Sequence, residues 1–491
     1  MNRLFVALSM IWLSASSSGL AQSPKSAQAT PILGGAYASS VRHPDVFLTE
    51  KDLIDLAGRI NQLGSYSARR FDQLAGQVAR DLAGGNKWDA AYSGCSTDTY
   101  NYAFSYEPQT IHGEDHVPEV RADMGLAANL VPPRGAAVVA SRLALYAALM
   151  KAGAKRPINA PDPAYAAAVA AKILVAWSTS GFRDDHGRFR ENPSQFCGAE
   201  GKFDQAAFAG VGLVVSRGIV YSVQAEDLLM YVGTLGDADV TRVEAFDAAM
   251  FGLLRNALNY NLQLHAWPCD HYSNHAANQL AALLALARVQ NNQRAFVAVL
   301  NGGDDAIRVS LPWIAFFQRA VYGAADTPNG CYANKATDGF ASRPFFQTRA
   351  VASGEIDDRY RNADPGQGIG YPMFTLERLY DAAEILRNAG FDPYGYRGAH
   401  RQSIEAATQY YACLAKGAGF GGVVTAANSA SCPDVAQYYG KIVSGVDRML
   451  VIGALRFPNN GLVASLDAAA RAAASSGPFA LDAILFGKWR G

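Results

Sequence analysis

The chain has 491 residues, of which 50% are hydrophobic, and its 43 basic residues balance its 43 acidic ones. A chain of this length and apolar content can bury a large core, while the zero net charge excludes capture of nucleic acid or a polyanion by an overall positive field. Any affinity for an acidic ligand must therefore come from a local site.

The beginning of the chain is typical of a secretory signal peptide. Arg3 precedes an apolar run at residues 4–13, and small residues follow as far as Ala21. The run is too short to cross a bilayer. We expect residues 1–21 to be a signal peptide, residues 22–44 a polar leader and residues 45–491 a single domain. The protein is then expected to be periplasmic or secreted, with no membrane segment.

Helical spacing of apolar residues recurs along most of the chain, with Gly, Pro or Asp at the turns. The predicted helices cover residues 48–82 with a break near Gly64, 135–153, 164–179, 203–221, 225–235, 240–257, 274–289, 293–300, 307–322, 372–389, 400–416, 433–455 and 465–474. Alternating strand patterns are scarce. So many helices joined by short turns predict an all-α fold, an incomplete (α/α) toroid of paired helices.

Two long stretches, residues 84–134 and 324–370, break the helical pattern and are expected to be irregular. Both are rich in aromatic residues, which argues against disorder. Their rings could form a carbohydrate-binding platform or could pack onto the helices. The first stretch contains HGEDH at residues 112–116, where the Glu does not have the spacing of a helical zinc motif, so we predict no metal site.

Six cysteines in an exported chain indicate disulfides rather than metal ligands. Cys413 and Cys432 are expected to pair, because their bond would close a Gly/Ala/Ser-rich loop between two helical segments. The pairing of the other four is left open by the sequence; they are Cys95, Cys197, Cys269 and Cys331.

The stretch 264–289 combines a polar first half with an apolar helix. Ser273 or Asn274 is a natural N-cap, so Asn274 and His275 are expected at a helix N-terminus, where backbone N–H groups and the helix dipole favour an anion such as a carboxylate. The alternative interpretation is that Asn274 only caps the helix and His275 only fills its first turn.

A second helix begins near Pro372, which would occupy the favoured first helical position. Tyr371 then lies at the N-terminus of this helix, as His275 does in the other. A tyrosine there can be a packing residue or a proton carrier. Two candidate proton carriers at two helix N-termini favour the second interpretation.

These motifs, in this order, resemble the alginate lyase family of polysaccharide lyases. An Asn-His pair opens a helix in SNHAANQLAALLAL, and an acidic-Arg segment precedes a Tyr that opens a helix in GEIDDRYRNADPGQGIGYPMFTLERLYDAAEILRNAGFDPYGY. The upstream segment GVGLVVSRGIVYSVQAEDLL is also similar. The resemblance covers residues 207–396. The chain departs from it at Ser273, where typical members have a second Asn, and at Asn278, where they have an aromatic residue.

The resemblance implies an (α/α) toroid that cleaves a uronic acid polysaccharide by β-elimination without a metal or other cofactor. It implies that Asn274 and an Arg neutralise the sugar carboxylate and that His275 and Tyr371 move the protons. Arg359 is the expected Arg, with Arg361, Arg349 and Arg343 as alternatives. The expected partner is an acidic polysaccharide or oligosaccharide of alginate, mannuronan or glucuronan type, bound by a monomer that contacts no nucleic acid.

Two other functions remain open from the sequence. A glycoside hydrolase would need two carboxylates facing each other across a cleft. The candidates are Glu114, Asp115, Glu355, Asp357 and Asp358. A periplasmic glycan-binding protein would have the same fold without the chemistry.

Overall fold

The computed structural model describes residues 33–83, 87–93, 99–107, 119–126, 136–180, 205–263, 271–324, 326, 351–358, 367–417, 425, 432 and 447–464. The expected signal peptide lies outside these residues. In the part of the chain that is described, no helix is both long enough and apolar enough to cross a membrane.

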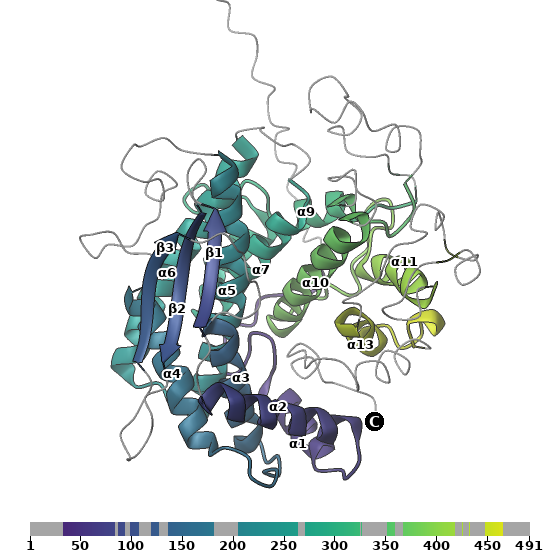
Figure 1. Cartoon of the computed structure of the whole chain (residues 1–491). Helices are drawn as coiled ribbons and strands as arrows, with labels where there is room; N and C mark the ends of the chain where they lie inside the picture. Colours follow the sequence, from purple (N-terminus) through teal and green to yellow (C-terminus); the bar gives the residue numbers. More distant parts are fainter. Residues whose placement is uncertain are drawn as a thin grey trace, which may run out of the picture. The chain divides into compact units, whose positions relative to one another are not determined.

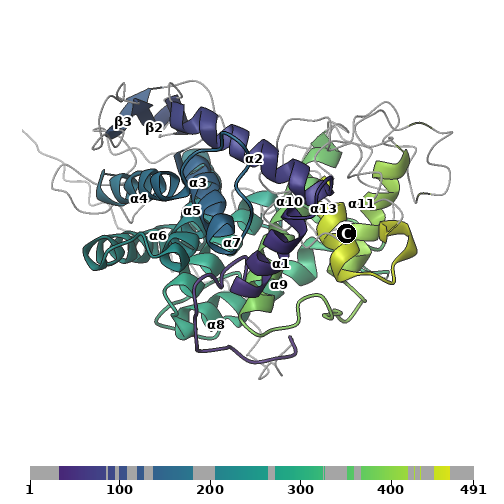
Figure 2. The same cartoon turned by 90° about the horizontal axis from the view of Figure 1, so that it is seen from below.

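Helices dominate the structure (Figures 1 and 2). They are α1 (Glu50–Ile60), α2 (Tyr66–Ala83), α3 (Ala136–Lys151), α4 (Pro163–Ser180), α5 (Gln205–Val232), α6 (Asp237–Gln263), α7 (Asn274–Val289), α8 (Gln293–Asn301), α9 (Trp313–Ala320), α10 (Gln367–Asn388), α11 (Ile404–Gly417) and α13 (Asp447–Arg456). The predicted helix at residues 465–474 lies outside the described residues.

The helices pack as alternating inner and outer members. The inner series runs α3, α5, α7 and α10, each packed against the next. Between them along the chain, α4 packs against α3 and α5, α6 against α5 and α7, and α8 against α7. Successive helical hairpins therefore place one helix inside and one outside, which is the pairing of an incomplete (α/α) toroid. The predicted helical fold class is confirmed.

The composition of each helix explains its layer. α3 and α7 are rich in Ala and Leu and have no continuous charged face, as expected of helices surrounded by protein. In contrast, α1 and α2 each have one apolar face and one charged face. Leu53 and Leu56 lie on the buried face of α1, and Thr49 caps its N-terminus in a capping box with Asp52.

The expectation that residues 84–134 are irregular was wrong. They include three antiparallel strands in the order β1 (Lys87–Ser93), β2 (Thr99–Glu107) and β3 (Glu119–Leu126). This sheet packs against α3, α4 and α5. The signal was available, because aromatic residues recur at every second position from Tyr100 to Tyr106, the period of a strand.

α5 is one continuous helix where two were predicted. The gap between the two predicted helices, residues 222–224, includes the polar residues Ser222 and Gln224. Both side chains are buried, and the Ser141 hydroxyl of α3 donates a hydrogen bond to Gln224 Oε1 at 3.0 Å. The Ser222 hydroxyl donates to the carbonyl of Ile219 within the helix. A polar contact between two inner helices therefore explains these residues.

The segment before α1 is part of the same compact unit as the helices, from residue 33 onwards. Asp227 of α5 accepts hydrogen bonds from the backbone N–H groups of Asp45 and Val46. Arg288, in the last turn of α7, forms an ion pair with Asp45 and donates to the carbonyl of Ala38 at 2.7 Å. These contacts attach the segment to the C-terminal end of α7.

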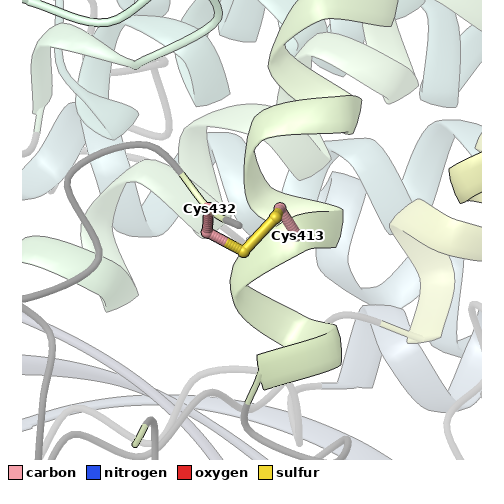
Figure 3. The surroundings of a disulfide bond; sticks show 2 residues. All are labelled: Cys413 and Cys432. Carbon is pink, nitrogen blue, oxygen red and sulfur yellow. A yellow bond between two sulfur atoms is a disulfide. The ribbon is translucent and has the colours of Figure 1, made fainter. Parts of the chain in front are cut away.

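The predicted bond between Cys413 and Cys432 is confirmed (Figure 3). Cys413 lies on α11, and its Cα is 5.6 Å from that of Cys432. The other four cysteines lie outside the described residues.

A pair of buried carboxyl groups joins α5 to α6. Glu226 is 2% exposed and Asp247 is 1% exposed, and the two carboxyl groups lie close enough to affect each other's pKa. Burial, with the nearby charges of Asp247, Asp227 and Glu244, raises the pKa of Glu226 well above its usual value. Burial raises the pKa of Asp247 to about 7. Ionising both carboxyl groups would place two negative charges close together in a buried site, which costs free energy. The folded pair therefore retains a proton at pH values where the unfolded chain has lost it.

We expect this pair to make the protein less stable as the pH rises from about 4 to about 7. A carboxyl group with a raised pKa stabilises the fold fully only below its unfolded pKa, and this contribution is lost as the pH passes the folded value. Glu226→Gln replaces the protonated partner by a neutral amide. It should reduce the loss of unfolding free energy between pH 5 and pH 8 by on the order of 2 kcal/mol, measured by urea denaturation.

Asp237→Asn is the matched control, because Asp237 is an exposed acid on α6, ten residues before Asp247, and its charge is not among those that act on the pair. It should leave the pH dependence close to that of the wild type. Asp45, whose pKa burial raises to about 6, adds the same trend to all three proteins. Equal pH dependence in wild type and Glu226→Gln would show that the pair does not hold the proton.

Candidate active site

The N-terminus of α7 forms as the sequence predicts. Ser273 is the N-cap, in an extended conformation, and its side chain accepts a hydrogen bond from the backbone N–H of His275. Asn274 and His275 are therefore the first two residues of the helix. The residues before Ser273 in this stretch, 264–270, lie outside the described part of the chain.

His275 is the one residue of α7 that is not buried. All other residues of this helix, from Asn274 to Val289, are enclosed by neighbouring helices. Asn274 is 1% exposed, whereas His275 is half-buried. The central helix thus reaches the surface at a single side chain, and that side chain is an imidazole that can exchange protons near neutral pH.

Asp358 links the N-terminus of α7 to α10. Its Oδ2 accepts a hydrogen bond from the backbone N–H of Asn274 at 2.8 Å and another from the Thr375 hydroxyl at 2.9 Å. The Asp358 side chain is fully buried. Because a single oxygen atom accepts both bonds, the two donors can be no farther apart than two hydrogen-bond lengths. This contact fixes the first turn of α7 against α10.

The segment that carries Asp358 is itself held firmly. The N–H of Gly354 donates to the carbonyl of Tyr322 at 2.8 Å, and the N–H of Tyr322 donates to the carbonyl of Glu355 at 2.9 Å. Gly354 has a φ of +87°, and a Cβ atom there would overlap the carbonyl oxygen of Ala406. Glycine is therefore required for the close approach of this segment to α11.

Tyr371 lies one helical turn before Thr375 on α10, and its side chain is half-buried. Residues four apart lie on the same side of a helix. The hydrogen bond between Thr375 and Asp358 therefore places Tyr371 on the side of α10 that faces the N-terminus of α7. Tyr371 and the first turn of α7 are thus connected through Thr375 and Asp358. The catalytic roles of His275 and Tyr371 stay predictions from the sequence.

The predicted start of this helix was wrong. α10 begins at Gln367, and Pro372 lies inside it rather than at its first position. Proline lacks a backbone N–H, so the turn before Pro372 has one hydrogen bond fewer than a regular helix. Tyr371 consequently projects from the early part of α10 and not from its first residue.

The N-terminus of α7 does bind a carboxylate, but this carboxylate is the side chain of Asp358 and not a ligand. The Asp358 carboxylate accepts the Asn274 N–H, and the Ser273 side chain accepts the His275 N–H. The backbone donors of the first turn that were expected to face a substrate carboxylate are thus already engaged. Positive charge for a substrate must come from side chains.

Three of the carboxylates considered for a hydrolase are described, and none lines an open surface. Glu355, Asp357 and Asp358 are each fully buried. Glu355 accepts a hydrogen bond from the N–H of Ala352, and Asp357 accepts one from the hydroxyl of Tyr322. These groups stabilise their own segment. Glu114 and Asp115 lie outside the described residues.

A second phenol lies at the same end of α7. Tyr272 directly precedes the N-cap and is half-buried. Burial raises its pKa; the charge of Arg319 opposes this rise, and that of Asp357 adds to it. Tyr272 therefore stays protonated at neutral pH, a neutral hydrogen-bonding group beside His275.

The sequence did not single out a contact between α5 and α10. The Cζ atom of Arg217 lies 5.6 Å from the ring centroid of Phe374, a cation–π contact between residues 157 positions apart in the numbering. Phe374 is 46% exposed. The family resemblance covered both segments, yet only the fold shows that these two side chains meet.

Arg359, the residue expected to neutralise the substrate carboxylate, lies outside the described residues. The same holds for its alternatives Arg361, Arg349 and Arg343, and for the HGEDH segment. Its assignment stays a prediction from the sequence.

Searches of protein-family models and of curated proteins find no match to this chain. Among solved structures, the chain is similar to an alginate lyase from Bacteroides ovatus, with 10% sequence identity and a TM-score of 0.49, over 91% of this chain and 99% of that one. A similarity this distant assigns neither a family nor an activity to the protein.

Proposed function

We propose that the protein is an exported polysaccharide lyase that cleaves a uronic acid-containing polysaccharide by β-elimination. The single observation that carries the proposal is the Asp358 link, which holds the helix start bearing Asn274 and His275 against the side of α10 that bears Tyr371. An imidazole and a phenol on two helices joined in this way are a pair of groups that can remove and deliver protons.

The reaction requires three changes on one sugar unit. The proton on C5 is removed, the bond between C4 and the glycosidic oxygen breaks, and a C4–C5 double bond forms. The electron pair of the C5–H bond becomes the second bond of that alkene, and the departing oxygen takes a proton. The sugar carboxylate must be neutralised while C5 loses its proton, because charge builds up on it. In this proposal Asn274 and Arg359 neutralise it.

The roles of His275 and Tyr371 depend on the sugar. In D-mannuronate the C5 proton and the C4 oxygen leave from the same side, so Tyr371 alone could act as base and then as acid. In L-guluronate they leave from opposite sides, so His275 would be the base and Tyr371 the acid. Alginate, mannuronan and glucuronan are the proposed substrates, and the mechanism uses no cofactor.

The proposal is tested by incubating the purified protein with each uronan and recording ultraviolet absorbance. A lyase product absorbs because its new double bond is conjugated with the carboxylate, so absorbance should rise as the chains shorten. Shortening of the chains without absorbance would identify a hydrolase. Affinity for a uronan without any product would identify a glycan-binding protein. Either result would contradict the lyase proposal.

A further inference from the structure

We propose that Arg217 and Phe374 form a subsite that binds the uronate unit next to the one that reacts. The inference rests on the proposed function and adds to it a specific side-chain pair for substrate recognition. Neither residue belongs to the proposed proton-transfer machinery.

The location of the pair comes from helix packing. α7 packs against both α5 and α10. Arg217 projects from α5 and Phe374 from α10, and the guanidinium lies 5.6 Å from the ring centroid. The contact therefore joins the two helices that flank α7. Phe374 directly precedes Thr375, whose hydroxyl donates to the same Asp358 oxygen as the Asn274 N–H, so the α10 end of the pair lies close to the first turn of α7.

The position of Phe374 on α10 also places it close to Tyr371. Phe374 follows Tyr371 by three residues, and residues three apart on a helix are neighbours with Cβ atoms about 5–6 Å apart. This distance is comparable to the length of one sugar unit. A polysaccharide whose reacting unit lies at Tyr371 would thus have its adjacent unit at Phe374.

The chemistry of the pair fits a uronate. Phe374 is 46% exposed, and it is the aromatic member of the four large hydrophobic side chains exposed in the described part of the chain; the other three are Ile54, Leu63 and Ile158. A sugar ring has an apolar face that can stack on such an aromatic ring. The guanidinium has five N–H donors in a planar fork and can bind a carboxylate through two parallel hydrogen bonds, and the cation–π contact orients it.

The same contact could instead serve only to brace α5 against α10. A brace would affect stability, whereas a subsite would discriminate carboxylated from neutral sugars. The two roles are therefore separated by comparing a short uronate oligosaccharide with its carboxyl-reduced counterpart, in which each carboxylate has become a neutral CH₂OH group.

Binding would be measured by calorimetry in a Tyr371→Phe background, so that ligand is not consumed. Arg217→Met should raise the Kd for the uronate oligosaccharide about tenfold or more, as expected for loss of a charged hydrogen-bond pair, and leave the Kd for the reduced oligosaccharide within about twofold. Phe374→Leu should weaken both ligands, because stacking does not depend on the carboxylate. On the polymer, Arg217→Met should raise KM more than it lowers kcat.

Lys151→Met is the matched control. Lys151 also lies over an aromatic ring, that of Tyr231, at 4.6 Å from the centroid. Tyr231 is fourteen residues after Arg217 on α5, about 21 Å along the helix axis. This variant should leave both Kd values unchanged.

The inference is overturned if Arg217→Met and the control give the same Kd for the uronate oligosaccharide, even if Arg217→Met lowers the Tm. If Arg217→Met does not fold, Arg217→Lys, which keeps the charge but not the fork of donors, is measured in its place. Unchanged affinity for the uronate oligosaccharide in both Arg217→Lys and Phe374→Leu would overturn the subsite. Failure of the proposed function has a different signature, the absence of unsaturated product from wild type. The binding comparison would then be made in the wild-type background. If the wild type binds the uronate oligosaccharide more tightly than the reduced one and Arg217→Met loses this difference, the subsite is supported. If the wild type shows no such difference, the subsite is refuted.

Discussion

Tyr371→Phe is expected to lower kcat on the best uronan about 100- to 10,000-fold, the usual effect of removing a positioned acid or base. The phenyl ring would still fill the half-buried position of Tyr371, so the affinity for substrate should change little. The measurement is kcat from the initial rise in ultraviolet absorbance, together with Kd for a short oligosaccharide. Near-normal turnover in Tyr371→Phe would remove this residue from the mechanism.

His275→Ala extends this test to the stereochemistry. If Tyr371 serves as both base and acid on mannuronate, the loss of rate on mannuronan should be smaller than the loss on guluronate-rich polymer, where His275 is the proposed base. Equal losses on both substrates would show that His275 has one role for the two sugars. Because His275 is the half-exposed residue of α7, its truncation leaves no large cavity in the core.

Asp358→Asn is expected to lower kcat about 10- to 100-fold although Asp358 does not contact the substrate in our proposal. The amide has nearly the same size, but its oxygen carries no negative charge and is a weaker acceptor for the Asn274 N–H and the Thr375 hydroxyl. A displacement of about 1 Å between groups that act together can cost on the order of 100-fold in rate. KM should change much less, since the substrate-binding side chains remain.

A positioning role differs from a purely structural one in its controls. Asp357→Asn makes the same chemical change at the neighbouring buried carboxylate, which accepts a hydrogen bond from Tyr322. Asp357→Asn should lower the Tm by about as much as Asp358→Asn does, but it should reduce kcat less than Asp358→Asn does. Thr375→Val should resemble Asp358→Asn, and Thr375→Ser, which keeps the hydroxyl, should restore activity. If kcat in all four variants simply follows the Tm, Asp358 has no positioning role.

Local patterns were sufficient to predict most helices. The Ser273 cap, the apolar run of α7 and the break between α1 and α2 near Gly64 depend on residues close together in the sequence, so periodicity and capping rules identify them. The pairing of Cys413 with Cys432 was predicted for the same reason, since one short loop separates the two cysteines.

Features that depend on tertiary contacts could not be predicted in this way. Gln224 fell between two predicted helices, because its partner, Ser141, is far away in the sequence. Asp358 was only a candidate carboxylate for a hydrolase, since nothing near it in the sequence shows that it would accept hydrogen bonds from Asn274 and Thr375.

If the protein is the proposed lyase, the burial of α7 limits how its specificity could change during evolution. A substitution at any α7 position other than His275 would disturb the core, and buried apolar truncations typically cost about 2–5 kcal/mol. Few proteins could tolerate several such losses. Variation in the recognised sugar would therefore accumulate at exposed positions on flanking helices, such as Phe374, and in the connecting segments. The helix that carries Asn274 and His275 would meanwhile change slowly, so the reaction could be inherited while the substrate diverged.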